Sequence, residues 1–116
     1  MSFSLMALGN QVSHPMLTVT AINHGRRPVT LTAVGVGLPD KYCYFTNSNV
    51  RFPFVLSEDN PKCDAMNDAK TTALELKGEG YNGKLKMKGF YKSATGKFFK
   101  SKTMKFDLEG YSTFRE

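Results

Sequence analysis

Apolar and polar residues alternate in the segment 17–22, which reads Leu-Thr-Val-Thr-Ala-Ile. A period of two is typical of a β-strand with one face in the core and the other in water. A second β-rich run, 29–38, follows a turn-forming linker in which Asn23 and Gly25 tolerate a left-handed backbone. In this run the large apolar side chains change parity near Ala33, which predicts a β-bulge. The centre of the fold is therefore predicted to be a strand, a turn and a bulged strand.

The segment 84–92 alternates as clearly, with apolar residues on one side and lysines on the other. A Ser-Ala-Thr-Gly loop and a second lysine-rich run follow, which predicts a hairpin. The length of the loop decides the register. A loop of three residues places Lys88 opposite Lys102, which is repulsive unless an anion lies between them. A loop of four residues turns Lys100 and Lys102 inward and places these residues outward: Lys84, Lys86, Lys88, Phe90, Phe99 and Lys105.

The remaining segments carry weaker signals. Residues 3–8 predict an edge strand, and Pro53 limits the run 50–56 to an edge strand or a crossover at the rim. The polar stretch 57–70 is predicted to be a surface loop. The segment 71–77 alternates as a strand does, but Asp68 as a cap and a glycine as a stop also fit a short helix; we favour the strand.

Many short strands with frequent turn signals favour an all-β fold, an antiparallel two-sheet sandwich of immunoglobulin-like type. We expect about seven strands, at most one short helical turn and a single domain spanning residues 1–116, with an open barrel as the main alternative. The core is predicted to contain Leu17, Val19, Leu31, Leu85 and Met87.

Composition narrows the class of protein further. No apolar run is long enough to span a membrane, and the first residues lack the features of a secretory signal, so we expect a cytoplasmic protein. Without export, reduced Cys43 and Cys63 are favoured over a disulfide. The cysteines and histidines lack zinc-ligand spacing, and Asp59, Asp64 and Asp68 lack the order of a calcium loop. We predict no metal and no cofactor.

The basic residues are unevenly distributed. The formal net charge is +6, and residues 84–105 contain eight lysines and no Asp or Glu. Lysines with interleaved aromatic rings on a sheet suit single-stranded nucleic acid, although lysines also guard sheets against aggregation. Arg26 and Arg27 beside a turn suit an anion, or they only solvate the turn. Tyr42 and Tyr44, on a short rim segment, suit an interaction surface.

No nucleophile elbow, phosphate loop or other catalytic motif is present, and we predict that the protein is not an enzyme. Two functions stay open. The first is a binding or adaptor module for an unidentified protein partner, as is common for sandwich domains. The second is polyanion binding, with single-stranded nucleic acid as the ligand, through the hairpin 84–105.

Two stretches of the chain resemble a known family. One is the Asn-His-Gly-Arg-Arg-Pro-Val-Thr segment 23–30, and the other is the hairpin 89–102 with its Thr-Gly-Lys turn. Both are similar to segments of small, mostly uncharacterised bacterial and mobile-element proteins built as an immunoglobulin-like sandwich. The segment 41–71 departs from that pattern. The resemblance implies a fold and no established activity.

Overall fold

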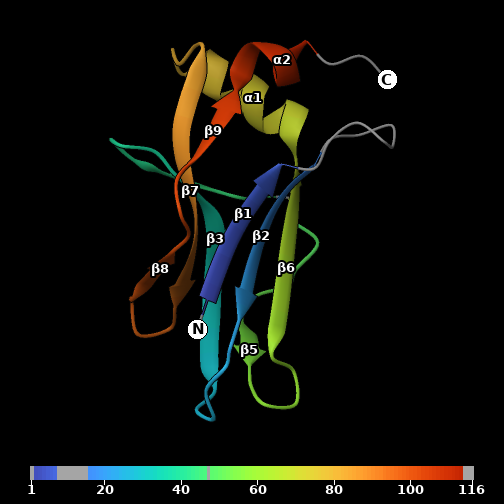
Figure 1. Ribbon diagram of the computed structural model, residues 1–116, viewed down its shortest axis with the longest axis vertical. Helices are drawn as coiled ribbons and strands as arrows, with labels where there is room; N and C mark the ends of the chain where they lie inside the picture. The colour runs from blue at the N-terminus through green and yellow to red at the C-terminus, as the bar shows by residue number, and fades with distance from the viewer. Residues whose placement is uncertain (1, 8–15, 47, 114–116) are drawn as a thin grey trace.

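The computed structural model describes residues 2–7, 16–46 and 48–113, and within these ranges it contains nine strands and two helices (Figure 1). The elements are β1 (Ser2–Ala7), β2 (Met16–Ile22), β3 (Val29–Gly37), β4 (Tyr42–Tyr44), β5 (Phe54–Leu56), β6 (Lys62–Asp68), α1 (Ala69–Gly78), β7 (Lys84–Ser93), β8 (Phe98–Lys100), β9 (Met104–Asp107) and α2 (Leu108–Ser112).

The strands form two antiparallel sheets. One has the order β1-β2-β6. In the other, β3 pairs with β7. The outer edge of β3 pairs with β4 along one part and with β5 along another. The outer edge of β7 pairs in the same way with β8 and with β9. The helices lie together at one end of the molecule (Figure 1). The prediction of an antiparallel β-sandwich is confirmed at this level. The expected seven strands and single helical turn were wrong, because both edges of the second sheet are interrupted and two helices cover one end.

Two clusters of side chains form the core. Val19, Val34 and Tyr91 belong to the cluster that joins the two sheets. The second cluster packs the helices on the strand ends and includes Leu17, Val36, Ala69, Leu76, Met87 and Phe106. Four of the five residues predicted to be buried have 0% exposure, namely Leu17, Val19, Leu31 and Met87. The fifth, Leu85, is only partly buried.

Tyr91 crosses the core from one sheet to the other. Its hydroxyl donates to the Val19 carbonyl oxygen at 2.5 Å and accepts from the Ala65 backbone N–H at 3.2 Å, so it bonds to both β2 and β6. The ring is completely buried. Burial, followed by a hydrogen bond with Cys63, raises the pKa of the Tyr91 hydroxyl far above its ordinary value of 10.0.

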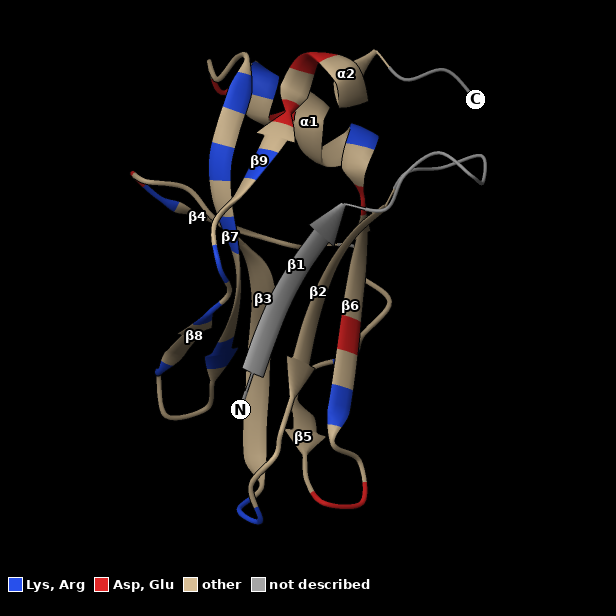
Figure 2. Ribbon diagram, viewed as in Figure 1, with Lys and Arg blue, Asp and Glu red and all other residues tan. Residues whose placement is uncertain are grey.

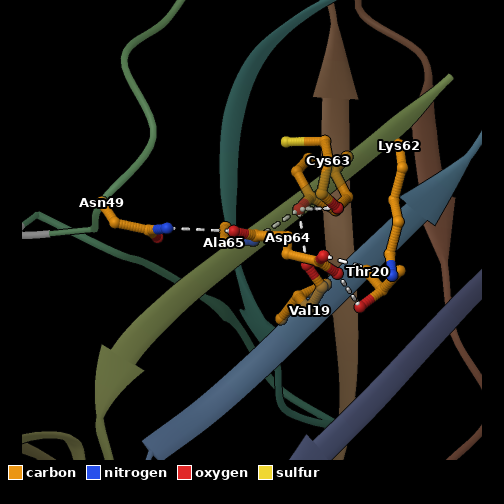
Figure 3. Close-up of polar contacts among 8 residues, drawn as sticks. Val19, Thr20, Asn49, Lys62, Cys63, Asp64 and Ala65 are labelled. Atoms are coloured by element: carbon orange, nitrogen blue, oxygen red, sulfur yellow. Dashed lines mark hydrogen bonds and ion pairs between the residues drawn. The ribbon is translucent and has the colours of Figure 1, made fainter. Parts of the chain in front are cut away.

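The polar side of β2 is not in water, contrary to the prediction from its alternation. Thr18 is 7% exposed and Thr20 is 9% exposed, because β1 and β6 flank β2 on both edges. The Thr20 hydroxyl donates to the Asp64 carboxylate at 2.6 Å, and the Lys62 ammonium lies 3.4 Å from that carboxylate (Figure 3). The neighbouring strand β6 thus supplies a hydrogen-bond partner for Thr20, whereas the buried Thr18 hydroxyl has none within the described residues.

The bulge predicted near Ala33 is confirmed. The register between β3 and β7 shifts between Leu31, which pairs with Ser93, and Ala33, which pairs with Lys92. The shift lets Leu31 and Val34 both face the core. The predicted edge strand after Pro53 is also confirmed, since the short β5 pairs with β3.

The segment 57–70 was predicted to be a surface loop, and this was wrong because it contains β6. Cys63 and Ala65 alternate inward, but they are too small to give a strong apolar pattern. The side chain of Asn49 covers part of the outer edge of β6. It donates to the Asp64 carbonyl at 3.2 Å (Figure 3) and accepts from the Met66 N–H at 2.7 Å.

The strand favoured for 71–77 was also wrong, since α1 occupies this segment. Asp68 caps the helix by accepting from the N–H groups of Lys70 and Thr71. The buried positions have the helical spacing i, i+3, i+4, i+7 and are Ala69, Thr72, Ala73 and Leu76. Leu74, which a strand would place beside Leu76, is 50% exposed. A second capped helix, α2, follows β9 and is linked to α1 by an ion pair of 3.1 Å between Lys77 and Glu109.

Candidate functional site

The hairpin between β7 and β8 has a loop of three residues. The Ser93 N–H donates to the Lys97 carbonyl at 2.9 Å, which closes the loop around Ala94, Thr95 and Gly96. Gly96 has a φ of 86°, a left-handed conformation that glycine adopts without strain. Of the two registers open from the sequence, the shorter loop is therefore the one adopted.

The register of this hairpin changes once more beyond β8. Phe90 pairs with Lys100, but further along β7 Lys86 pairs with Lys105, one residue out of step with the first part. Ser101 lies at the break, where its hydroxyl accepts from the Gly89 N–H at 2.8 Å and its own N–H donates to the Gly89 carbonyl. Lys88 therefore does not pair with Lys102, and the directly opposed lysines are Lys86 and Lys105.

Directly opposite residues share a face of a sheet, so these registers define the outer face of the second sheet. One cross-strand row contains Tyr44, Gly35, Phe90 and Lys100, and the next contains Tyr42, Gly37 and Lys88. We call the outer surface of β4, β7, β8 and β9 the aromatic–lysine face. Its residues are Tyr42, Tyr44, Lys84, Lys86, Lys88, Phe90, Lys92, Phe98, Lys100 and Lys105.

Four aromatic rings pack together on this face. Phe90 is at the centre and meets Tyr42 and Tyr44 edge to face, with ring centroids 4.9 and 5.2 Å apart. Phe98 stacks on Tyr42 at 4.7 Å. Phe90 lies against Gly35, where a Cβ atom would come within 2.9 Å of the phenylalanine ring. Because Gly35 has no side chain, Phe90 can lie close to the sheet, and both tyrosines pack over its ring.

The two tyrosines leave ring surface accessible to a ligand. Tyr42 is 38% exposed and Tyr44 is 46% exposed, whereas Phe90 is 0% exposed. Two lysines lie over rings of the cluster, with the Lys100 ammonium 5.2 Å from the Tyr42 centroid and the Lys92 ammonium 5.6 Å from that of Phe98. Such contacts keep the cations close to the exposed rings.

Within the described residues, no lysine of the aromatic–lysine face forms an ion pair with a carboxylate, although Asp107 lies directly opposite Lys84 at one end of the face. The ion pairs found in the described ranges involve Arg26, Lys41, Lys62 and Lys77, all outside this face. Figure 2 shows basic residues along β7, β8 and β9, while most acidic residues lie on or next to the helices, on β6 and in the loop before it. Two others are Asp40, in the loop before β4, and Asp107, at the end of β9. Because Lys86 and Lys105 are directly opposite each other, their charges repel.

A hollow of about 300 Å³ opens on this face beside Tyr42. Its lining includes the three lysines Lys86, Lys88 and Lys100 and the rings of Tyr42 and Phe90, with no carboxylate. Gly37, Leu38, Pro39 and Thr103 complete the wall. The hollow therefore combines positive charge with aromatic surface.

The structure brings together most of the predicted hairpin residues and corrects three of them. Phe90, predicted to be an exposed ring, is buried beneath the tyrosines. Phe99, predicted to face outward, pairs with Tyr91 and so shares the opposite face, with the Lys97 ammonium 5.0 Å from its ring centroid. Lys100, predicted to point inward in the longer-loop register, pairs with Phe90 and faces outward.

Sequence reasoning missed part of the face. It named Tyr42 and Tyr44 only as a separate surface and did not include Phe98, Lys92 or Lys100. The alternation of Gly35 and Gly37 was the available signal, because two glycines on one face of a strand leave room for rings from its neighbours.

Arg26 and Arg27 lie away from the aromatic–lysine face, in the β2–β3 turn at the end of the molecule opposite the helices (Figure 1). Asn23 holds this turn, donating to the Arg27 carbonyl at 2.9 Å and accepting from the Gly25 N–H at 2.9 Å. Neither Asn23 nor Gly25 has a left-handed backbone, so that part of the turn prediction was wrong. Arg26 is exposed and lies 3.8 Å from Glu58, which supplies its negative partner.

A second cavity, of about 400 Å³, lies between β4 and α1 and is lined in part by Cys43, Asp68 and Glu75. Burial raises the pKa of the Cys43 thiol, which disfavours the reactive thiolate. Cys43 and Cys63 are not joined in a disulfide. Across the described ranges, no three His, Cys, Asp or Glu side chains are grouped closely enough to hold a metal ion.

Comparison with known proteins gives no relative: no protein-family model, no curated protein and no solved structure matches the chain. Neither helix of the described part is long and apolar enough to cross a membrane.

Proposed function

We propose that this protein is a non-enzymatic binding module that takes single-stranded nucleic acid on the aromatic–lysine face. The observation that carries the proposal is the exposure of Tyr42 and Tyr44 beside Lys86, Lys88 and Lys100, none of which forms an ion pair within the described residues. Phosphates neutralise the lysines, and unpaired bases stack on the tyrosine rings. A bound phosphate also relieves the repulsion between Lys86 and Lys105.

A single-stranded ligand fits this surface better than a duplex does. Tyr42 and Tyr44 offer flat ring surface, but paired bases in a duplex are stacked on each other and cannot also stack on a protein ring. The face belongs to a sheet and presents no helix to a groove. Sequence-tolerant binding is expected, because every base has a π face whereas the lysines contact only the backbone.

Binding of a protein partner, the first function predicted from the sequence, stays a prediction. Strand addition needs free backbone at a sheet edge. Asn49 already occupies the N–H of Met66 and the carbonyl of Asp64 on the outer edge of β6. This reduces the edge available to a partner and is the reason for placing nucleic acid first.

The strand order also supports the finer description of the fold as immunoglobulin-like. With β1, β2 and β6 as strands A, B and E, and β3, β7 and β8/β9 as strands C, F and G, the two sheets follow the immunoglobulin arrangement. We infer this topology from the strand order. The single domain of residues 1–116 and the resemblance to small bacterial and mobile-element proteins stay predictions.

Fluorescence anisotropy with a labelled single-stranded 12-mer at low salt tests the proposal. We expect a Kd tighter than about 100 μM, and a loss of at least about tenfold when Lys86, Lys88 and Lys100 become glutamine. The matched control replaces Lys62, Lys70 and Lys77, which lie on β6 and α1. Both variants lower the net charge from +6 to +3.

The control separates a site from a general effect of charge. Equal losses in the two triple variants would overturn the proposal, as would equal competition by poly-L-glutamate or a duplex. A Tyr42→Leu, Tyr44→Leu double variant should bind several-fold more weakly, because stacking contributes about 1–3 kcal/mol per base. Unchanged circular dichroism spectra establish that each variant is folded.

A further inference from the structure

The hollow beside Tyr42 has more positive charge than one backbone phosphate requires. Lys86, Lys88 and Lys100 all line it, and Lys105 lies directly opposite Lys86. An internal phosphodiester carries a single negative charge, so its binding would leave most of this charge unbalanced. A phosphate monoester carries a charge of about −1.5 to −2 at pH 7 and has three acceptor oxygens.

The shape and lining of the hollow add a second argument. A volume of about 300 Å³ is at the small end of ligand pockets, which suits one nucleotide rather than a length of strand. Tyr42 forms an aromatic wall, and Lys100, whose ammonium lies 5.2 Å from its centroid, covers the ring. Lysine side chains rotate freely, so Lys100 can move from the ring to a phosphate and leave the ring surface to a base.

We infer that this hollow binds the terminal nucleotide of a strand, with its phosphate monoester held by Lys86, Lys88 and Lys100 and its base against Tyr42. This inference rests on the proposed function and adds a preference for phosphorylated strand ends. Thr103 also lines the hollow. The shared chemistry is a nucleotide with a monoester phosphate, whether at a 5′ end, at a 3′ end or free in solution.

The test compares four ligands with the intact protein. They are 12-mers of one sequence with a 5′-phosphate, a 3′-phosphate or no terminal phosphate, each with its label on an internal base, and a free nucleoside monophosphate as competitor. We expect one phosphorylated end to bind at least fivefold more tightly than the unphosphorylated strand. Saturating free nucleotide should abolish the difference between the strands, because every strand then binds only through the rest of the aromatic–lysine face.

Lys92 provides the matched control. It lies on β7 and on the same face, but it contacts Phe98 and does not line the hollow. Lys100→Gln should remove the preference for the phosphorylated end, whereas Lys92→Gln should weaken all the strands by similar factors and keep the preference. Equal loss of preference in both variants would overturn the assignment to the hollow.

The outcomes distinguish this inference from the proposed nucleic-acid function on which it rests. If all three strands bind equally well, the terminal-phosphate site is wrong and the proposed nucleic-acid function stands. If no strand binds but isothermal titration calorimetry shows that the free nucleotide does, in a manner lost in Lys100→Gln, the nucleic-acid function is wrong and the monoester site stands. Absence of binding by all four ligands overturns both.

Discussion

Gly35 occupies a position that admits no larger side chain. A Cβ atom there would overlap the Cys43 carbonyl oxygen and come within 2.9 Å of the Phe90 ring. At Gly37 the corresponding atom would meet the Tyr42 ring at 3.4 Å and the Lys88 carbonyl oxygen at 3.7 Å, which are ordinary contact distances. The spacing of β4 from β3 and the position of Phe90 therefore depend on Gly35. The absence of a side chain at Gly35 therefore allows the aromatic cluster to pack close to the sheet.

Tyr91 is the residue whose chemistry most affects stability. Because burial raises the pKa of its hydroxyl, the folded protein keeps a proton that the unfolded chain loses near pH 10. Its contribution to the free energy of unfolding is thus complete below pH 10 and is lost as the pH rises further, by about 1.4 kcal/mol per pH unit. The raised pKa of the buried Cys63 thiol acts in the same direction from about pH 9.

Tyr91→Phe should lower the free energy of unfolding at pH 7 by about 1–3 kcal/mol, because the Ala65 N–H and the Val19 carbonyl lose their partner. Urea unfolding measures this, with Tyr44→Phe on the exposed surface as the control. Between pH 10 and 11 the variant should lose stability less steeply than the wild type. Parallel losses in the two proteins would contradict the role assigned to the Tyr91 proton.

At the scale of elements, packing decided the structure of α1, for which the local sequence favoured a helix and a strand about equally. Asp68 as a cap favoured a helix, and the alternation of Thr72, Leu74 and Leu76 favoured a strand. The helix buries Ala69, Thr72, Ala73 and Leu76 together against the strand ends, at the expense of exposing Leu74. A short helix is stabilised mostly by such an apolar face rather than by propensity.

A pair of leucine substitutions tests the orientation of α1. Leu76→Ala should lower the free energy of unfolding by about 2–5 kcal/mol, since the side chain is 1% exposed. Leu74→Ala should change it by less than about 1 kcal/mol, because half of that side chain is in solvent. Urea unfolding of both variants gives the comparison. Similar costs at the two positions would indicate the strand, in which both leucines share a face.

At the scale of the whole molecule, the charges are separated by location. The lysines of the aromatic–lysine face form no ion pair with a described carboxylate, and Asp107 is the acidic residue directly opposite one of them, Lys84. Most other acidic residues lie on or next to the helices, on β6 and in the loop that precedes it (Figure 2). Like charges directly opposite each other on a sheet are destabilising. The protein therefore keeps a surface that is unfavourable for its own stability and favourable for a polyanion.

Lys105→Glu should increase stability and weaken polyanion binding, because it places a carboxylate opposite Lys86. We expect the Tm to rise by about 1–4 °C and oligonucleotide affinity to fall roughly 3–10-fold. Lys70→Glu on α1 is the control, since both changes lower the net charge from +6 to +4. Thermal melting and anisotropy measure the two effects. A lower Tm for Lys105→Glu, or equal affinities in the two variants, would contradict the argument.

The sequence by itself determined the strands with strong alternation, the bulge near Ala33 and the exposure of Lys84, Lys86 and Lys88. A period of two follows from the geometry of an extended backbone, so a clear pattern needs no knowledge of its neighbours. The candidate site was predictable to the same extent: its lysines could be read from the pattern of the hairpin, and its tyrosines only as a separate surface.

Only the tertiary structure decided the remaining features. β6 shows little apolar pattern, and its place depends on pairing with β2. The hairpin register depends on the loop at Gly96 and the break at Ser101, which shift the lysines between faces. Phe90 is buried because Tyr42 and Tyr44, more than forty residues earlier in the chain, lie over it. Burial and register are properties of the contacting pair, so neither partner's local sequence contains them.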